Sequence, residues 1–177
     1  KGGITVSGGE ALLQIDFVTE LFTLAKEKGV NTCLDTSGNP FTREEPFYSK
    51  FEKLMEVTDL FMLDIKEIDE DEHKQLTGQT NKNILDMATC LSDHGKAMWI
   101  RHVLVPGITD DDGQLHRLRA FIDTLKTVER VEILPYHTLG VFKWKELGIP
   151  YALEDVEPPT KEQVEHAREI IIPGYKS

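Results

Sequence analysis

The segment Leu60-Phe-Met-Leu-Asp-Ile-Lys66 decides the fold. It is a nearly continuous apolar run that ends beside two charged side chains, Asp64 and Lys66. A strand covered on both faces by other elements has this composition, and such strands are typical of parallel sheets. The sequence therefore predicts a central parallel strand over Leu60 to Ile65, with polar groups at its carboxyl end.

Short apolar runs recur on both sides of this strand at intervals of roughly thirty residues. Four of them predict further strands: Gly3 to Ser7, Val30 to Leu34, Ala97 to Val105 and Val131 to Leu134. Amphipathic stripes between them predict helices: one opened by Asp16 as N-cap and ended by Gly29 at C′, then Pro46 to Val57, Ile84 to Leu91 and Asp111 to Lys126. Thr160 and Gln163, in capping-box spacing, open a last helix that stops before Pro173. The acidic runs Asp69 to Glu72 and Asp110 to Asp112 are interpreted as solvated loops and helix starts.

Strands that alternate with helices imply an α/β fold, a parallel sheet with right-handed crossovers. A doubly wound sheet and a partial (β/α) barrel both satisfy this pattern, and both bind ligands at the carboxyl ends of the strands. The polar groups expected at those ends are Gly8-Gly9-Glu10, Asp35-Thr36, Asp64 with Lys66, Arg101-His102 and Tyr136-His137. We expect one edge of the sheet to collect them.

Composition restricts the class of protein. The 177 residues suffice for one domain with a sizeable core, and the net charge of −11 argues against nucleic acid and anionic membranes as partners. The sequence contains neither an apolar run near the ~20 residues of a membrane span nor the apolar region of a signal peptide, so we expect a cytoplasmic protein. The two cysteines, Cys33 and Cys90, are predicted to be buried, reduced thiols.

Gly8, Gly9 and Glu10 admit two interpretations. Two glycines leave backbone groups uncovered, so a ligand can lie against the main chain while the carboxylate of Glu10 binds a charged amine. Alternatively, the pair is a turn that uses glycine for its positive φ. Asp35-Thr36 has a similar competitor, an Asx-turn that closes a strand.

Charged side chains on two strands are also predicted to face a ligand. Asp64 and Lys66 flank Ile65 and share one face of their strand, where they form either an ion pair or a site for a zwitterion. Arg101 and His102 alternate, so only one of them points inward. We choose Arg101, because a guanidinium matches a carboxylate bidentately, and expect His102 to be packed against a helix.

Five segments together resemble a known family, in its order and with its spacing: Val6-Ser-Gly-Gly-Glu10, Leu34-Asp-Thr-Ser-Gly38, Phe61-Met-Leu-Asp-Ile-Lys66, Ile100-Arg-His-Val-Leu-Val-Pro-Gly107 and Ile133-Leu-Pro-Tyr-His-Thr-Leu-Gly140. The chain resembles the radical S-adenosylmethionine (SAM) enzymes and, within them, the activating enzymes of pyruvate formate-lyase. The resemblance covers residues 1–177 as one domain.

The resemblance implies a partial (β/α) barrel with SAM and a [4Fe–4S] cluster at the top of the strands. It implies reductive cleavage of SAM to a 5′-deoxyadenosyl radical, which abstracts hydrogen from a glycine of a partner, a glycyl radical enzyme such as pyruvate formate-lyase. A one-electron reductant such as flavodoxin is implied as a second partner.

The resemblance also implies roles for individual residues. Gly8, Gly9 and Glu10 would hold the methionine amino group, and Asp35, Asp64 and Lys66 the methionine and ribose portions. Arg101 would lie on the carboxylate side, and Leu134 and His137 against the adenosine. Asp35, Thr36, Met62 and Asp64 are similar to a site for a monovalent cation.

One departure from the family is plain. Its cluster is held by a Cys-x₃-Cys-x₂-Cys motif, and neither Cys33 nor Cys90 has a cysteine at that spacing. We therefore expect an inactive fragment that lacks the first strand and its cluster loop, with the cluster in the full-length parent, and an exposed strand edge that favours self-association. Two alternatives stay open: a SAM- or nucleoside-binding module without redox chemistry, and a radical SAM enzyme that acts on another substrate.

Overall fold

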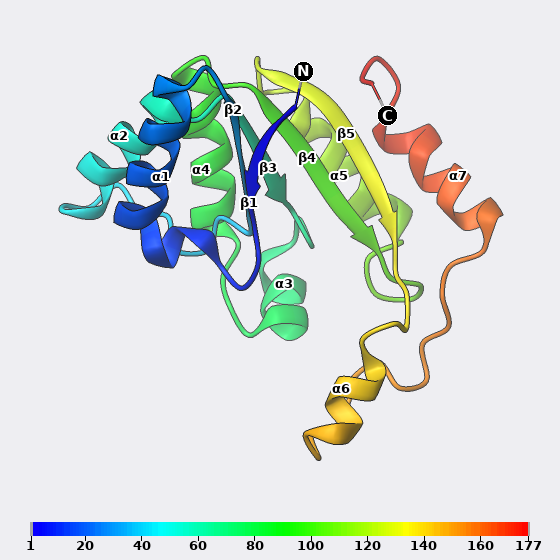
Figure 1. Cartoon of the computed structure of the whole chain (residues 1–177). Helices are drawn as coiled ribbons and strands as arrows, with labels where there is room; N and C mark the ends of the chain where they lie inside the picture. Colours follow the sequence, from blue (N-terminus) through cyan, green and yellow to red (C-terminus); the bar gives the residue numbers. More distant parts are fainter. Residues whose placement is uncertain (1, 177) are drawn as a thin grey trace.

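The computed structural model describes residues 2–176, so the outermost positions of the predicted domain, 1 and 177, lie outside the described residues. Within that range the chain forms a parallel sheet of five strands in the order β1-β2-β3-β4-β5 (Figure 1). The strands are β1 (Gly3–Val6), β2 (Asn31–Thr36), β3 (Leu60–Asp64), β4 (Met98–Leu104) and β5 (Val128–Pro135). The predicted α/β class and the five predicted strands are confirmed.

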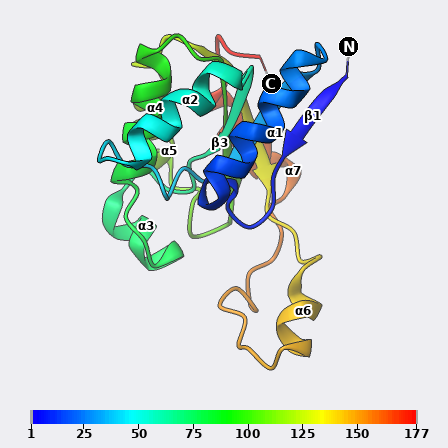
Figure 2. The same cartoon turned by 60° about the vertical axis from the view of Figure 1, so that its left-hand side comes forward.

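Helices connect the strands; most of them cover one face of the sheet, and two lie at the carboxyl ends of the strands (Figures 1 and 2). They are the short 3₁₀ helix η1 (Ala11–Gln14) and the α-helices α1 (Ile15–Glu27), α2 (Phe47–Val57), α3 (Glu70–Thr77), α4 (Lys82–Asp93), α5 (Asp112–Ile122), α6 (Val141–Glu146) and α7 (Lys161–Ile171). None of the helices between residues 2 and 176 is long and apolar enough to cross a membrane.

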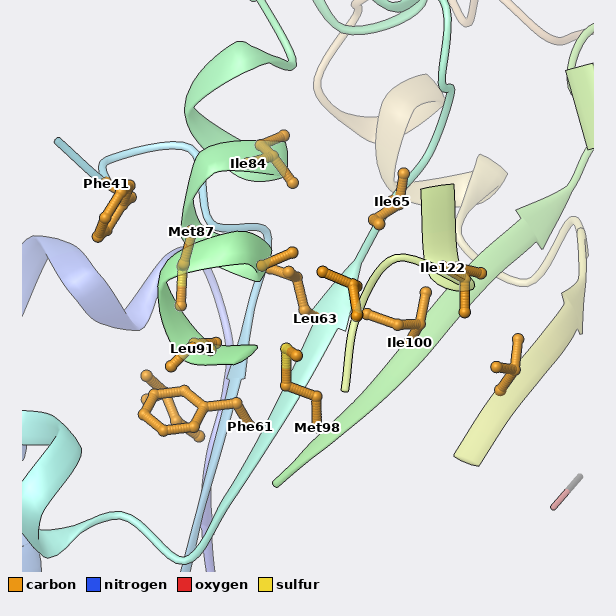
Figure 3. Packing of buried hydrophobic residues seen from close by; sticks show 14 of the residues in the cluster. Phe41, Phe61, Leu63, Ile65, Ile84, Met87, Leu91, Met98, Ile100 and Ile122 are labelled. Atoms are coloured by element: carbon orange, nitrogen blue, oxygen red, sulfur yellow. The ribbon is translucent and has the colours of Figure 1, made fainter. Parts of the chain in front are cut away.

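A single hydrophobic core holds the helices against the sheet. Leu63 on β3 and Met98 and Ile100 on β4 lie opposite Met87 and Leu91 on α4, as Figure 3 shows, and all five side chains are fully buried. Each such side chain stabilises the folded state by about 1.5–3 kcal/mol through its removal from water. This packing fixes which face of each strand points toward the helices.

The face of the sheet opposite the helices carries half-buried side chains. In β2, Leu34 and Thr36 are buried whereas Cys33 and Asp35 are partly exposed, and the other strands alternate in the same way. Because successive side chains point to opposite faces, the charged residues predicted for the site share this second face. All five strands run in one direction, so their carboxyl ends meet at one edge, near α3 and α6 in Figure 1.

Several predicted helix boundaries are confirmed, and one predicted N-cap is wrong. Thr160 and Gln163 form the expected capping box of α7, and Gly29 follows α1 with a φ of +68°. Asp16 is not an N-cap, because η1 leads directly into α1 and Gln14 holds the cap position. Asp16 instead lies in the first turn, where it pairs with Lys50 at 2.6 Å.

Two helices were not predicted, and both lie at the carboxyl edge. The acidic run Asp69 to Glu72 is a helix start, as interpreted, but the helix α3 that Asp69 caps and Gly78 ends was not predicted in its extent. The segment after β5 contains α6, whose residues are all at least partly exposed. The strands β2 and β5 are also longer than predicted, so that Asp35 and Thr36 lie inside β2 and not after it.

Candidate functional site

Arg101 joins the ends of two neighbouring strands. Its Nε donates to Oδ1 of Asp64 at 2.9 Å, and its Nη2 lies 2.8 Å from the same oxygen and donates to Oδ1 of Asp35. Lys66 donates to the other oxygen of Asp64 at 3.2 Å. Two carboxylates and two cations thus form one network across β2, β3 and β4, with Arg101 pointing to the half-buried face as predicted.

This network is largely shielded from solvent. The side chains of Arg101, Asp64 and Asp35 are 16, 19 and 22% exposed. Burial alone would lower the pKa of the Arg101 guanidinium, but the carboxylates of Asp64 and Asp35 outweigh it and raise that pKa. The guanidinium therefore stays charged, and it keeps the two carboxylates in fixed positions.

Glu10 ties the loop after β1 to the end of β2. Its Oε1 accepts from the backbone N–H of Leu12 at 3.0 Å and from the Thr36 hydroxyl at 2.5 Å, and its Oε2 accepts from the backbone N–H and the hydroxyl of Ser37 at 2.9 and 2.5 Å. Both oxygens are engaged by protein donors. Glu10 therefore positions the loop, and an amine ligand would have to share its carboxylate with these donors.

Gly8 and Gly9 make the turn that Glu10 anchors. Their φ angles are +93° and +50°, a region that side chains with a Cβ rarely adopt, so the turn interpretation is confirmed. A Cβ built at either glycine meets nothing within 4 Å. Open space next to the backbone is what the ligand interpretation also requires.

A cavity of about 200 Å³ lies beside the Arg101 network, lined by residues that include Asp64, Lys66, Ser37 and His73. His73 is 1% exposed, and within residues 2–176 its Nδ1 has no hydrogen-bond partner. Burial lowers the pKa of His73, so the ring is neutral. Pockets for whole ligands measure ~300–1,000 Å³, so this cavity has room for part of such a molecule.

Leu134 and His137 lie two strands away from Asp64, at the end of β5. Leu134 is half-buried and pairs in register with Val103 on β4, whereas His137 is exposed beyond the strand. The structure thus brings Asp35, Asp64, Lys66 and Arg101 into direct contact and leaves Leu134 and His137 at the same edge but at its far side.

The four residues of the predicted cation site do not all face one point. Asp35 and Asp64 are both bound to Arg101, and Met62 shares their face, but the Thr36 hydroxyl donates to Glu10 on the opposite face. Only the backbone carbonyl of Thr36 remains for a cation there. In the part of the chain that the structure describes, no three His, Cys, Asp or Glu side chains gather as metal ligands.

The two cysteines do not fit an iron–sulfur cluster. Cys33 lies on the half-buried face of β2 and is only partly buried, so the prediction of two buried thiols is confirmed for Cys90 alone. Cys90 is buried on α4, where its Sγ lies 3.8 Å from the hydroxyl of Tyr48. Burial raises the pKa of both thiols, as expected for inert, reduced cysteines. A cluster of this kind needs three thiolates at one place, and these residues do not supply them.

A match to a protein-family model identifies the family of this chain. The model of the Radical SAM superfamily matches residues 1–118, which include four of the five strands and the Arg101 network. The chain belongs to the radical SAM superfamily. This superfamily member carries its glycine turn and its charged network at the carboxyl edge of a parallel sheet.

Curated relatives narrow the family further. The chain is 59% identical over 170 residues to the pyruvate formate-lyase-activating enzyme of Streptococcus mutans, and the match covers 96% of this chain and 65% of the relative. It is 52% identical to the enzyme of the same name from Listeria monocytogenes, with 96 and 68% covered. This radical SAM chain thus belongs to the family of pyruvate formate-lyase-activating enzymes and spans about two thirds of their length.

Solved structures agree on the fold. A domain of the pyruvate-formate lyase-activating enzyme from Bacteroides vulgatus aligns with a TM-score of 0.79 at 21% identity, over 99% of this chain and 97% of that domain. TYW1 with a lysine-pyruvate adduct bound aligns with a TM-score of 0.67 at 16% identity, over 98% of this chain and 51% of TYW1. The partial-barrel prediction is confirmed by these likenesses.

Sequence reasoning missed two residues at this edge, Ser37 and His73. Ser37 donates twice to Glu10, from its backbone N–H and its hydroxyl. His73 is buried beside Asp64 and Lys66. The cap signals of α3, Asp69 and Gly78, would have placed His73 on a helix that packs against the strand ends.

Proposed function

We propose that this chain is the SAM-binding part of a glycyl-radical-enzyme activase whose target is pyruvate formate-lyase. The observation that carries the proposal is the network of Asp35, Asp64, Lys66 and Arg101 at the carboxyl ends of three strands. A zwitterionic ligand needs both charge signs held in a fixed arrangement, and this network offers both. The names of the relatives, at 52 and 59% identity, support the choice of activase.

The roles within the site follow from position. The open backbone of Gly8 and Gly9 would receive the amino group, Asp64 and Lys66 the ribose and methionine portions, and Arg101 the carboxylate side. Asp35 would hold Arg101 in place, while Leu134 and His137 would cover the adenosine from β5. SAM, when bound, supplies the 5′-deoxyadenosyl group that takes a hydrogen from the glycine of the partner.

Glu10 acts through the loop in this proposal. Its contacts with Thr36 and Ser37 lock the glycine turn against β2, which keeps the backbone of Gly9 exposed at a fixed distance from the network. If a monovalent cation binds here, Asp35 and Asp64 provide its charged ligands and the backbone of Thr36 and Met62 completes the set.

The proposal also concerns the iron–sulfur cluster, the reductant and the cellular compartment. The iron–sulfur cluster would be held by a protein of the relatives' full length, because Cys33 and Cys90 lie on different elements and supply only two thiolates. A one-electron reductant such as flavodoxin would act on that protein. The two free thiols fit the reducing cytoplasm.

The test uses the full-length protein under anaerobic conditions. Incubation with SAM, a reductant and pyruvate formate-lyase should release 5′-deoxyadenosine and produce a glycyl radical signal, and Gly9→Val should abolish both. Release of deoxyadenosine without a glycyl radical would favour a radical SAM enzyme that acts on another substrate. Binding of SAM without any release would favour a module without redox chemistry.

A further inference from the structure

A second cavity, larger than the one beside Arg101, lies at the same edge of the sheet between α3 and α6. It has a volume of about 620 Å³ and is lined by Glu67, Glu72, Gln75, Leu76, Gly107, Ile108, Trp144, Tyr151, Ala152 and Leu153. We call it the Glu67 cavity. Its volume lies within the ~300–1,000 Å³ typical of binding sites, and none of its residues belongs to the proposed SAM site.

Glu67 is the most deeply buried residue of this cavity and has an unsatisfied oxygen. Its side chain is 2% exposed, and Oε1 accepts from the backbone N–H of Asp69 at 2.9 Å. Oε2 is also buried, and among the described residues it has no hydrogen-bond partner. Leaving a buried carboxylate oxygen unpaired is costly, and a donor from a ligand would remove that cost.

The nearest cations do not supply that donor. Lys66 is bound to Asp64, and Arg117 is bound to Asp69 at 3.1 Å. Glu72 adds a second carboxylate to the lining and contacts the side-chain amide of Gln114. The cavity therefore holds two carboxylates, and neither Lys66 nor Arg117 forms an ion pair with either of them.

Aromatic rings stand opposite these carboxylates. Trp144 and Tyr151 line the cavity with their ring centroids 5.5 Å apart, and the Tyr151 hydroxyl hydrogen-bonds that of Tyr136 at 2.8 Å. Aromatic faces attract cations, and a planar guanidinium stacks on them while it donates to a carboxylate. The lining thus fits an arginine side chain better than a compact ammonium group.

The segment that contributes Trp144 to the cavity also exposes several apolar side chains. Of the large hydrophobic residues that are exposed, most fall between 139 and 149: Leu139, Phe142, Trp144, Leu147 and Ile149, at 41–76% exposure. These residues form the 139–149 patch, which includes α6 and projects from the carboxyl edge in Figures 1 and 2. Exposed apolar side chains concentrated on one segment indicate a protein partner and not a small molecule.

We propose that the Glu67 cavity receives an arginine side chain from a segment of the partner protein, whose apolar residues cover the 139–149 patch. The proposal rests on the proposed function, since it assigns the docking of the protein substrate to a place beside the SAM site. Arginine and aromatic anchors in pockets are the usual energetic centres of protein interfaces.

The experiment titrates the chain with capped tripeptides and follows the indole N–H signal of Trp144 by NMR, assigned with Trp144→Phe. Leu-Arg-Leu should shift this signal with a Kd of about 1 mM, typical of a single anchor. The same tripeptide with citrulline in place of arginine should bind about tenfold weaker, because it lacks the charge. Glu67→Gln should weaken the binding of Leu-Arg-Leu by a similar factor. The control substitution Glu129→Gln, at an exposed position, should leave this binding unchanged.

Equal binding of the arginine and citrulline peptides, or unchanged binding of Leu-Arg-Leu to Glu67→Gln, would overturn the proposal. Tighter binding of agmatine, a small molecule with a guanidinium group, than of Leu-Arg-Leu would also overturn it. So would a Trp144 signal that shifts on dilution without peptide. The last would mean that a second copy of the chain covers the patch. SAM titrations of the same samples separate the two proposals, because Glu67→Gln should keep SAM binding. If the unsubstituted chain does not bind SAM, the proposed function is refuted, whether or not the peptides bind.

Discussion

Replacing Arg101 by methionine tests whether the charged network holds the site together. Methionine keeps the apolar stem of the side chain but removes the guanidinium, so Asp35 and Asp64 lose their common partner. Removing one member of a fully buried ion pair costs about 3–5 kcal/mol, and exposed pairs contribute about 0.2–1 kcal/mol. The carboxylates here are 22 and 19% exposed, and Lys66 stays bound to Asp64. We therefore expect a loss of about 2 kcal/mol.

Urea unfolding followed by circular dichroism measures this loss. With an m value of about 2 kcal/mol per molar urea, the midpoint of Arg101→Met should fall by about 1 M. Adding Asp35→Asn should recover about half of that fall, because it removes the carboxylate that no other cation within residues 2–176 contacts. Arg117→Met is the matched control, since its partner Asp69 lies at the surface, and its midpoint should stay nearly unchanged.

The reasoning is refuted if Arg101→Met unfolds at the same urea concentration as Arg117→Met. It is also refuted if Asp35→Asn destabilises the Arg101→Met variant further, because the two carboxylates would then not repel each other in the folded state.

Three further predictions concern pH, iron and association. His102 is 2% exposed with both ring nitrogens near backbone carbonyls, those of Ile65 and Thr109, and burial lowers its pKa. The unfolded chain therefore binds a proton near pH 6.5 that the folded chain does not, and stability should fall as the pH drops below about 6.5, by at most about 1.4 kcal/mol per pH unit for this residue. His102→Gln should reduce that slope in urea titrations between pH 7.5 and 5, and a slope equal to that of the exposed His116→Gln would contradict the assignment. Anaerobic reconstitution of this chain with iron and sulfide should give no stoichiometric four-iron chromophore, since Cys33 and Cys90 lie on different elements, and a typical absorption band with about four irons per chain would contradict this. The edge strand β1 should pair with another copy, so light scattering should show oligomers that grow with concentration, and a monomer at all concentrations would count against it.

Much of the fold follows from local sequence because short apolar runs alternate with amphipathic helical stripes along the chain. The alternation along β4 sufficed to point Arg101 toward the site and His102 toward the packed side, and the structure shows both. The direction of a side chain on a strand depends only on backbone pleating, which the sequence reveals through its period of two.

The rest depends on contacts between residues far apart in sequence. Glu10 was predicted to face a ligand, but Thr36 and Ser37 reach it across 26 and 27 residues and occupy its oxygens. The helix α3 was hidden because its hydrophilic sequence has few apolar residues, and His73 is buried only through its packing. Burial of Glu67 is similarly a tertiary effect that no local pattern announces.

The most direct test of the account is a titration of this chain with SAM, followed by nitrogen–proton correlation NMR, which detects weak binding. The account predicts that the backbone signals of Gly8, Gly9, Asp64 and Lys66 shift together along one saturation curve, and that Gly9→Val abolishes these shifts. Shifts confined to other parts of the chain, or no shifts at about 10 mM SAM, would contradict the claim that the carboxyl edge of this sheet is built to hold an adenosylated amino acid.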